Sequence, residues 1–318
     1  MSPNRDKLDG MSALPGLYTP IVTPFKNDTV DDAAIHRNVE RYMQTRLTGL
    51  VVLGSNGEAV MLDDSEAERV IVAARAGMPS SRPLIAGTGA ESTKATIAAC
   101  VRAARAGADA VLVRTPSFFK NMMTSDVYVR HYVAVAEASP VPVLLYNVSV
   151  YTGVTLPADA VGLLAEHPNI VGIKESGSDA ALLADYISRS GPDFFVLAGS
   201  GVTYFSGLVA GAEGAVLALA GIVPDLCADI LEHVRAGRIT EARTIQRRIT
   251  PLARTIGGLH GVPALKAALD LMGFDGGLPR APLGPTPRSV VEGLRRTLTD
   301  LGVPLLEPAP LDADPATT

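Results

Sequence analysis

The chain has 318 residues, of which 47% are hydrophobic, and its 28 basic and 33 acidic residues give a formal net charge of −5. This composition supplies a large core, and it lacks the basic runs interleaved with aromatic residues that bind nucleic acid. The longest apolar stretch, residues 215–223, is too short to cross a bilayer, and no polybasic or amphipathic segment indicates membrane binding. We therefore expect neither a nucleic-acid partner nor a membrane partner.

The cysteine content indicates the compartment. Cys100 and Cys227 are the only two cysteines, and neither belongs to a CxxC motif, so no disulfide framework is expected. The first residues, MSPNRDKLDGMSALPG, contain no apolar segment of the kind found in secretory signals. The sequence therefore predicts a cytoplasmic protein.

Short apolar runs alternate with longer alanine-rich runs along the chain. Eight of the short runs are expected to be strands: Gly16–Val22, Gly49–Leu53, Leu84–Gly87, Ala110–Val113, Val143–Tyr146, Ile170–Ile173, Phe194–Leu197 and Ala215–Leu219. Most of them show no polar alternation, which is typical of strands buried on both faces of a parallel sheet. They recur about every 20–35 residues, which is the length of a βα unit.

The runs between these strands have the features of helices. Ser65 is expected to open one of them, with Glu66 and Glu68 in its first turn, and Gly107 is suited to end the next. Eight βα units that close on themselves form a (β/α)8 barrel, which is the fold class that we predict. The alternative is a doubly wound open sheet. That fold favours a glycine-rich fingerprint after its first strand, whereas here the first strand leads into TPFKNDTVD.

Beyond about Pro224 the sequence contains helical patterns and no further strand pattern. The first of these helices completes the eighth βα unit, and the others are expected to form a C-terminal helical extension. The predicted organisation is an N-terminal tail over residues 1–15, a barrel over 16–236, a helical region over 237–304 and a disordered Pro/Ala/Asp-rich tail over 305–318.

Barrel enzymes place their active sites at the carboxyl ends of the strands. The segments expected there are GSNGE (Gly54–Glu58), TPSFFK (Thr115–Lys120), Tyr146-Asn147, Lys174-Glu175-Ser176 and AGSG (Ala198–Gly201). Lys174 is expected to be the one ionisable side chain in this set that directly ends an apolar strand. Glu175 then points to the other face, because successive side chains of a strand alternate.

A lysine at this position permits covalent chemistry. Desolvation in an apolar pocket favours the neutral amine, which can attack a ketone and form a Schiff base. The alternative is structural: the lysine extends to solvent at the rim or pairs with an acidic residue of a loop. From its position alone, both interpretations of Lys174 stay open.

The glycine-rich turns permit anion binding. Glycines let the backbone approach a ligand, and successive N–H groups in a turn such as GSNGE form an anion nest, to which Ser55 adds a hydroxyl. Each turn is equally consistent with a simple strand-to-loop connection, and AGSG leaves a phosphate-binding barrel open. The five histidines form no HxH, HxxxH or HExxH pair, so no metal site is predicted.

Taken together, Gly54–Glu58, Tyr146-Asn147, Gly172–Ser176 and Gly199-Ser200 resemble the motif set of the dihydrodipicolinate synthase / N-acetylneuraminate lyase family, and the resemblance covers about residues 16–285. It implies a class I, pyruvate-handling barrel with C-terminal helices, assembled as a homotetramer. It implies no cofactor, because the enzyme's own lysine forms a covalent imine with the substrate. The implied partners are pyruvate or another 2-oxo acid, and an aldehyde.

The resemblance also implies roles residue by residue. Lys174 matches the Schiff-base lysine, and Tyr146 matches the tyrosine that shuttles protons during imine formation and C–C bond making or breaking. Ser55 and Asn56 match the pair that holds the pyruvate carboxylate, largely through backbone N–H groups.

Two positions depart from the family pattern. Tyr151 stands where dihydrodipicolinate synthases have the arginine that binds the carboxylate of the aldehyde substrate, which argues against synthase activity. Phe118 lies in the loop where the family has a tyrosine, one that often reaches into the neighbouring subunit's site. The usual relay of hydroxyl groups is therefore incomplete unless Ser117 or water completes it.

Three further positions are implied to contact the substrate. Gly199 and Val216 match residues that line the pyruvyl pocket, and Ser176 stands where the 4-hydroxy-2-oxoglutarate aldolase branch has a serine that helps to hold the distal carboxylate. Segments such as YTGVTLPADAV and EHPNIVGIKESG are most similar to that branch. We therefore expect an aldolase that splits 4-hydroxy-2-oxoglutarate into pyruvate and glyoxylate. The alternatives are a synthase that condenses pyruvate with aspartate semialdehyde and, more remotely, a non-catalytic barrel that binds a keto acid.

Overall fold

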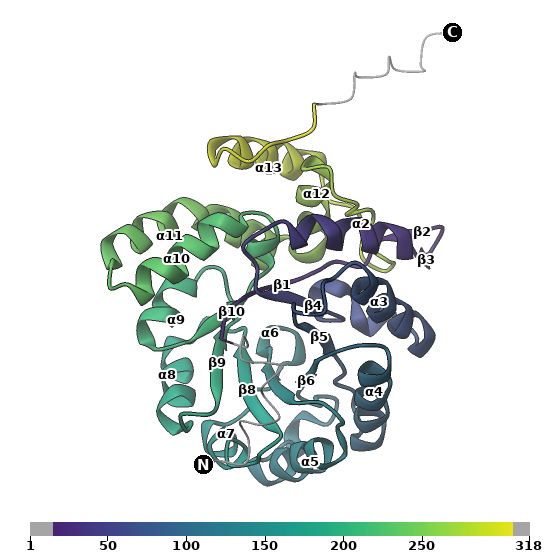
Figure 1. Cartoon of the computed structure of the whole chain (residues 1–318), viewed down its shortest axis with the longest axis vertical. Coiled ribbons are helices and arrows are strands. Elements are labelled where there is room, and N and C mark those ends of the chain that lie inside the picture. The colour runs from purple at the N-terminus through teal and green to yellow at the C-terminus, as the bar shows by residue number, and fades with distance from the viewer. Residues whose placement is uncertain (1–14, 308–318) are drawn as a thin grey trace.

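The computed structural model describes residues 15–307, and its central feature is a closed barrel of parallel strands (Figure 1). The barrel strands, in chain order, are β1 (Leu17–Pro20), β4 (Gly49–Val52), β5 (Leu84–Gly87), β6 (Ala110–Arg114), β7 (Val143–Asn147), β8 (Ile170–Glu175), β9 (Phe195–Ala198) and β10 (Gly214–Val216). Each strand pairs with the next, and β1 pairs with both β4 and β10, which closes the sheet. The predicted (β/α)8 barrel is confirmed.

Helices surround the barrel and continue beyond its last strand (Figure 1). The α-helices are α2 (Asp32–Met43), α3 (Asp64–Ala76), α4 (Thr93–Arg105), α5 (Ser125–Ala138), α6 (Ser149–Thr152), α7 (Ala158–Leu164), α8 (Ala180–Arg189), α9 (Tyr204–Ala210), α10 (Pro224–Arg235), α11 (Ile239–Arg254), α12 (Gly261–Leu271) and α13 (Arg288–Asp300). The short 3-10 helices are η1 (Ser55–Gly57), η2 (Ala59–Met61), η3 (Lys120–Met122) and η4 (Ala218–Gly221), and η5 (Thr255–Leu259) is a π-helix.

The core has two layers because the side chains of each strand alternate between the two faces of the sheet. On β7, for example, Leu144 and Tyr146 point into the barrel interior, whereas Val143 and Leu145 pack in the layer between the strands and the helices. The interior cluster consists of Tyr18, Val51, Ile85, Ala110, Leu112, Leu144, Tyr146, Val148, Val171, Leu197 and Val216.

The structure corrects several expected boundaries. The last strand ends at Val216, because residues 218–221 form the 3-10 helix η4. Helix α3 begins before Ser65: Asp63 is its N-cap and forms a reciprocal capping box with Glu66. A short antiparallel hairpin, β2 (Phe25–Lys26) with β3 (Thr29–Val30), follows β1 and was not expected.

The C-terminal helices lie against one side of the barrel. In Figure 1, α13 lies beyond α12 at the outer edge of the molecule. Helix α12 packs against α13 and also contacts the η1 turn at the end of β4. The proposed division at residue 236 stays a prediction. The expected tails over residues 1–15 and 305–318 fall almost entirely outside the described residues. No helix within the described part of the chain is long and apolar enough to cross a membrane.

Candidate active site

Tyr146 and Lys174 stand side by side at the carboxyl end of the barrel. They are register partners on the parallel strands β7 and β8, so both side chains lie on the same face of the sheet. That face is the barrel interior, and the ammonium nitrogen Nζ of Lys174 lies 4.4 Å from the centre of the Tyr146 ring. Strand pairing alone therefore brings a lysine amine and a phenol together.

Lys174 is buried, with only 4% of its surface exposed. Within residues 15–307, its amine forms no hydrogen bond or ion pair, and it lies over the face of the Tyr146 ring. A buried lysine normally has a carboxylate or carbonyl partner, because desolvation of an ammonium group is costly. The absence of such a partner leaves the amine available for a carbonyl compound.

The η1 turn at the end of β4 forms a second part of the site. The hydroxyl oxygens of Ser55 and Tyr146 lie 2.9 Å apart, so a hydrogen bond joins the turn to the phenol. Gly57 and Glu58 donate their N–H groups back to Gly54 and Ser55. The N–H groups of Ser55 and Asn56 begin the 3-10 turn and make no hydrogen bond within the described chain, so both remain available as donors.

Asn147 and Glu175 alternate to the outer face of the same two strands. The amide nitrogen of Asn147 donates to the Glu175 carboxylate at 2.5 Å, and the amide oxygen accepts from the backbone N–H of Leu156 at 2.9 Å. The other carboxylate oxygen of Glu175 accepts from Gly177. Burial raises the pKa of Glu175, and these hydrogen bonds oppose that shift. The pair therefore holds the ends of β7 and β8 together behind Tyr146 and Lys174.

Ser176 and Gly199 meet where β8 and β9 end. The Ser176 hydroxyl oxygen is buried and has no hydrogen-bond partner within the described residues. A Cβ atom added to Gly199 would lie 2.1 Å from that oxygen and 2.8 Å from the carbonyl oxygen of Glu175, so this position requires glycine. Val216 is buried in the same interior cluster as Tyr146.

Tyr151 and Phe118 lie farther out. Tyr151 is in α6, after β7, and is more than half exposed; partial burial and then the nearby Tyr146 raise its pKa. Phe118 is 77% exposed in the loop after β6, where its ring packs edge-on against Phe119 at 5.1 Å between ring centres. Tyr151 and Phe118 are thus the two predicted site residues whose side chains are exposed in the single chain.

One expectation about the strand ends was wrong. Arg114 is the last residue of β6, so Lys174 is not the only ionisable side chain that directly follows an apolar strand. The Arg114 guanidinium pairs with Glu91 at 2.8 Å, and this partner distinguishes Arg114 from Lys174.

Lys266, the other buried lysine of the described chain, was not predicted from the sequence. Its signal was a single charge within the otherwise apolar segment GVPALKAAL of α12, which suggests a buried acidic partner. No group of three or more His, Cys, Asp or Glu side chains that could hold a metal ion occurs among residues 15–307.

Comparison with known proteins agrees with this arrangement. Residues 13–301 match the dihydrodipicolinate synthetase family. The chain belongs to that family. Its members are class I lyases and aldolases that form a lysine Schiff base with pyruvate and need no external cofactor.

The relatives of this chain are named for one of two activities, an aldolase or a synthase. A probable mitochondrial 4-hydroxy-2-oxoglutarate aldolase from Emericella nidulans is 38% identical over 275 residues, covering 85% of this chain and 89% of the relative. A 4-hydroxy-tetrahydrodipicolinate synthase from Exiguobacterium sp. is 35% identical over 271 residues, covering 85% and 92%. Among solved structures, a chloride-inhibited dihydrodipicolinate synthase from Acinetobacter baumannii complexed with pyruvate has a TM-score of 0.85 and 33% identity, covering 91% and 99%.

Replacing Gly199 with alanine tests the packing at the ends of β8 and β9. Because the new methyl group would overlap the Ser176 hydroxyl and the Glu175 carbonyl, we expect Gly199→Ala to lower the free energy of unfolding by about 1–3 kcal/mol. Displacement of Ser176 should also lower kcat/KM at least about tenfold. Thermal denaturation and steady-state kinetics measure the two effects.

Gly191→Ala is the matched control, because a Cβ atom at Gly191 meets no atom within 4 Å. We expect this variant to keep the melting temperature and the activity of the unchanged protein. Wild-type stability and kinetics in Gly199→Ala would contradict the described packing.

Proposed function

We propose that this protein is a Schiff-base aldolase that cleaves 4-hydroxy-2-oxoglutarate to pyruvate and glyoxylate. The observation that carries the proposal is the buried amine of Lys174, which has no ionic partner among residues 15–307 and lies 4.4 Å from the centre of the Tyr146 ring. Membership in a family of pyruvate Schiff-base enzymes supports the same chemistry. The Emericella nidulans relative supports the choice of substrate.

The first half of the proposed reaction forms the imine. The neutral amine of Lys174 attacks the C2 ketone of the substrate, and the resulting carbinolamine loses water to give a protonated imine. Tyr146 donates and accepts the protons of this step, and its hydrogen bond to Ser55 gives the phenol a proton-exchange partner. The open N–H groups of Ser55 and Asn56 hold the carboxylate beside the ketone.

The second half cleaves the carbon–carbon bond. Tyr146 removes the proton of the C4 hydroxyl, the C3–C4 bond breaks, and its electron pair moves into the protonated imine to give an enamine. Glyoxylate leaves, C3 accepts a proton, and water hydrolyses the imine to release pyruvate and the free amine of Lys174. The preorganised amine and phenol contribute by holding the reacting groups in place.

The residues available to bind the distal carboxylate of the substrate distinguish this activity from synthase activity. Ser176 offers a buried hydroxyl without a partner in the described chain, beside the tight Gly199 contact. Tyr151 offers a phenol where a synthase is expected to have an arginine, and a guanidinium would bind a carboxylate much more strongly. Ser176 and Tyr151 therefore favour cleavage of 4-hydroxy-2-oxoglutarate over condensation with aspartate semialdehyde.

We further propose that the protein is a homotetramer in which a second copy covers an apolar patch beside the barrel mouth. The patch consists of Phe118, Phe119, Met122, Val150 and Tyr151, each more than half exposed. The two parts of the patch adjoin, because the ammonium group of Lys120 packs against Gly153 at the end of α6. Exposed aromatic and methionine side chains gathered in this way are typical of an interface.

The cellular location stays a prediction. The two free, buried cysteines are consistent with the reducing cytoplasm. The Emericella nidulans relative, in contrast, is named as mitochondrial.

The assembly is tested by sedimentation equilibrium. We expect the unchanged protein to sediment as four chains and Phe118→Asp to sediment as a smaller species, because a carboxylate in the contact would be desolvated without a partner. Val72→Asp places the same charge on an exposed apolar position of α3 and should leave the assembly intact. A single-chain mass for the unchanged protein would contradict the proposal.

The substrate is tested by measuring pyruvate release from 4-hydroxy-2-oxoglutarate in an assay coupled to lactate dehydrogenase. We expect kcat/KM for this cleavage to exceed that for condensation of pyruvate with aspartate semialdehyde by at least about 100-fold, because only the first substrate suits Ser176 and Tyr151. A faster condensation would instead favour the synthase. No turnover of either substrate would favour the non-catalytic barrel.

A further inference from the structure

A second buried lysine lies behind the η1 turn. Lys266 of α12 has no exposed side-chain surface, and its Nζ lies 2.6 Å from the carboxylate of Glu58, which is 1% exposed. Nζ also donates to the carbonyl oxygens of Thr23 at 2.8 Å and Leu278 at 3.0 Å. Two carbonyl oxygens therefore accept hydrogen bonds from the ammonium group and one carboxylate oxygen forms an ion pair with it, so Lys266 has the partners that Lys174 lacks.

Glu58 ends the turn that carries Ser55 and Asn56. It adopts a left-handed backbone conformation, with φ 54° and ψ 32°, which is strained for a residue other than glycine. Such a conformation persists only where the surroundings hold it. Here one carboxylate oxygen of Glu58 contacts Lys266, and the other accepts the backbone N–H of Arg280 at 2.8 Å. Both anchors belong to the C-terminal region of the chain.

Thr23 connects the same lysine to the residue before Glu58. Its carbonyl oxygen accepts from Lys266, and its hydroxyl donates to the carbonyl oxygen of Gly57 at 2.7 Å. Lys266 therefore fixes the turn at two consecutive residues, through the side chain of Glu58 and through Thr23. The N–H groups of Ser55 and Asn56, at the other end of the turn, are left without partners in the described chain.

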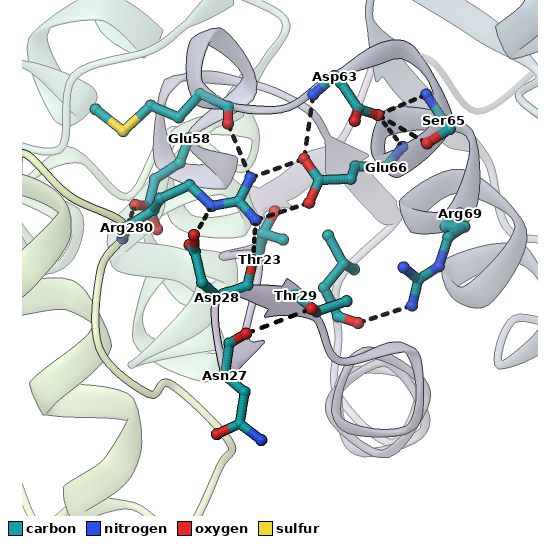
Figure 2. Close-up of polar contacts among 12 residues, drawn as sticks. Thr23, Asn27, Asp28, Thr29, Glu58, Asp63, Ser65, Glu66, Arg69 and Arg280 are labelled. Carbon is teal, nitrogen blue, oxygen red and sulfur yellow. Dashed lines mark hydrogen bonds and ion pairs between the residues drawn. The ribbon is translucent and has the colours of Figure 1, made fainter.

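A neighbouring ionic cluster, centred on Arg280, stabilises a different part of the chain. The Arg280 guanidinium contacts the Glu66 carboxylate at 2.7 Å, the Asp28 carboxylate at 2.9 Å and the carbonyl oxygen of Met61 at 2.9 Å (Figure 2). These bonds join the β2–β3 hairpin to the start of α3. The side chain of Arg280 makes no hydrogen bond to residues 55–58, so mutation can separate general stabilisation from support of the turn.

We propose that Lys266 and Glu58 are positioning residues for the carboxylate of the 2-oxo acid. They hold the η1 turn so that the N–H groups of Ser55 and Asn56 converge on that carboxylate, and they make α12 a necessary support of substrate binding. This inference rests on the proposed function, because it concerns the same bound 2-oxo acid. The pair contributes placement rather than charge, since an ammonium and a carboxylate in contact carry no net charge.

The test compares two ketones that differ in whether they carry a carboxylate. Pyruvate has one and acetone does not, and borohydride traps either ketone on Lys174 as an adduct that intact-protein mass spectrometry counts. In the paired variant Lys266→Met/Glu58→Gln, we expect the pyruvate concentration for half-maximal trapping to rise about tenfold or more, the equivalent of one lost charge-assisted contact. Trapping of acetone should stay within about twofold of the unchanged protein.

Paired substitution avoids leaving one buried charge alone. If the paired variant does not fold, Thr23→Val removes the bond to Gly57 and should raise the half-saturating pyruvate concentration about threefold. Arg280→Met is the matched control: it should lower the melting temperature through loss of the Glu66 and Asp28 contacts, and leave pyruvate trapping unchanged.

The outcomes separate this inference from the proposed function. Equal losses for pyruvate and acetone, or no loss for either ketone, would overturn the positioning role while the aldolase proposal stood. Absence of any pyruvate adduct in the unchanged protein would overturn the proposed function itself, and with it this inference.

Discussion

The parallel register between β7 and β8 is the constraint on which the site depends. It sets Tyr146 beside Lys174 inside the barrel and Asn147 beside Glu175 outside it. A slip of one residue on β8 would exchange the faces of Lys174 and Glu175, and the interior would then hold a carboxylate in place of an amine. Barrel closure, the interior packing and the Asn147–Glu175 hydrogen bond all oppose that slip.

The two buried lysines show how partners distinguish structural from chemical roles. Lys266 is surrounded by Glu58, Thr23 and Leu278, and removing one member of such a buried ion pair typically costs about 3–5 kcal/mol. Lys174 has the ring of Tyr146 and no anionic partner within residues 15–307. Its amine is therefore buried without an ion pair, which leaves it free to contact a carbonyl compound in the barrel interior.

Much of the fold could be predicted because buried parallel strands have a strong local pattern. The apolar runs before Asn147 and Lys174 identified β7 and β8, and barrel geometry placed their ends together. The end of β10 could not be predicted, because the apolar run 215–221 suits a strand and a 3-10 helix equally well. Asp63 was missed as the helix cap because Ser65, a residue of the same capping class, stands two positions later.

Long-range pairs account for the other omissions. The sequence around Glu58 does not predict its two partners, which are Lys266, more than two hundred residues later, and the backbone N–H of Arg280. Arg114 was passed over because its pairing with Glu91 also depends on tertiary structure. Phe118 is exposed in the single chain, so its part in the site stays a prediction that depends on the proposed assembly.

The proposed chemistry depends on a covalent imine between Lys174 and a 2-oxo acid. Incubation with pyruvate and borohydride, followed by mass spectrometry of the proteolytic peptides, tests it most directly. We expect a reduced pyruvyl adduct on Lys174 and none on Lys266, whose amine is held by three oxygen atoms. An unmodified Lys174 peptide, or an adduct confined to other lysines, would contradict it.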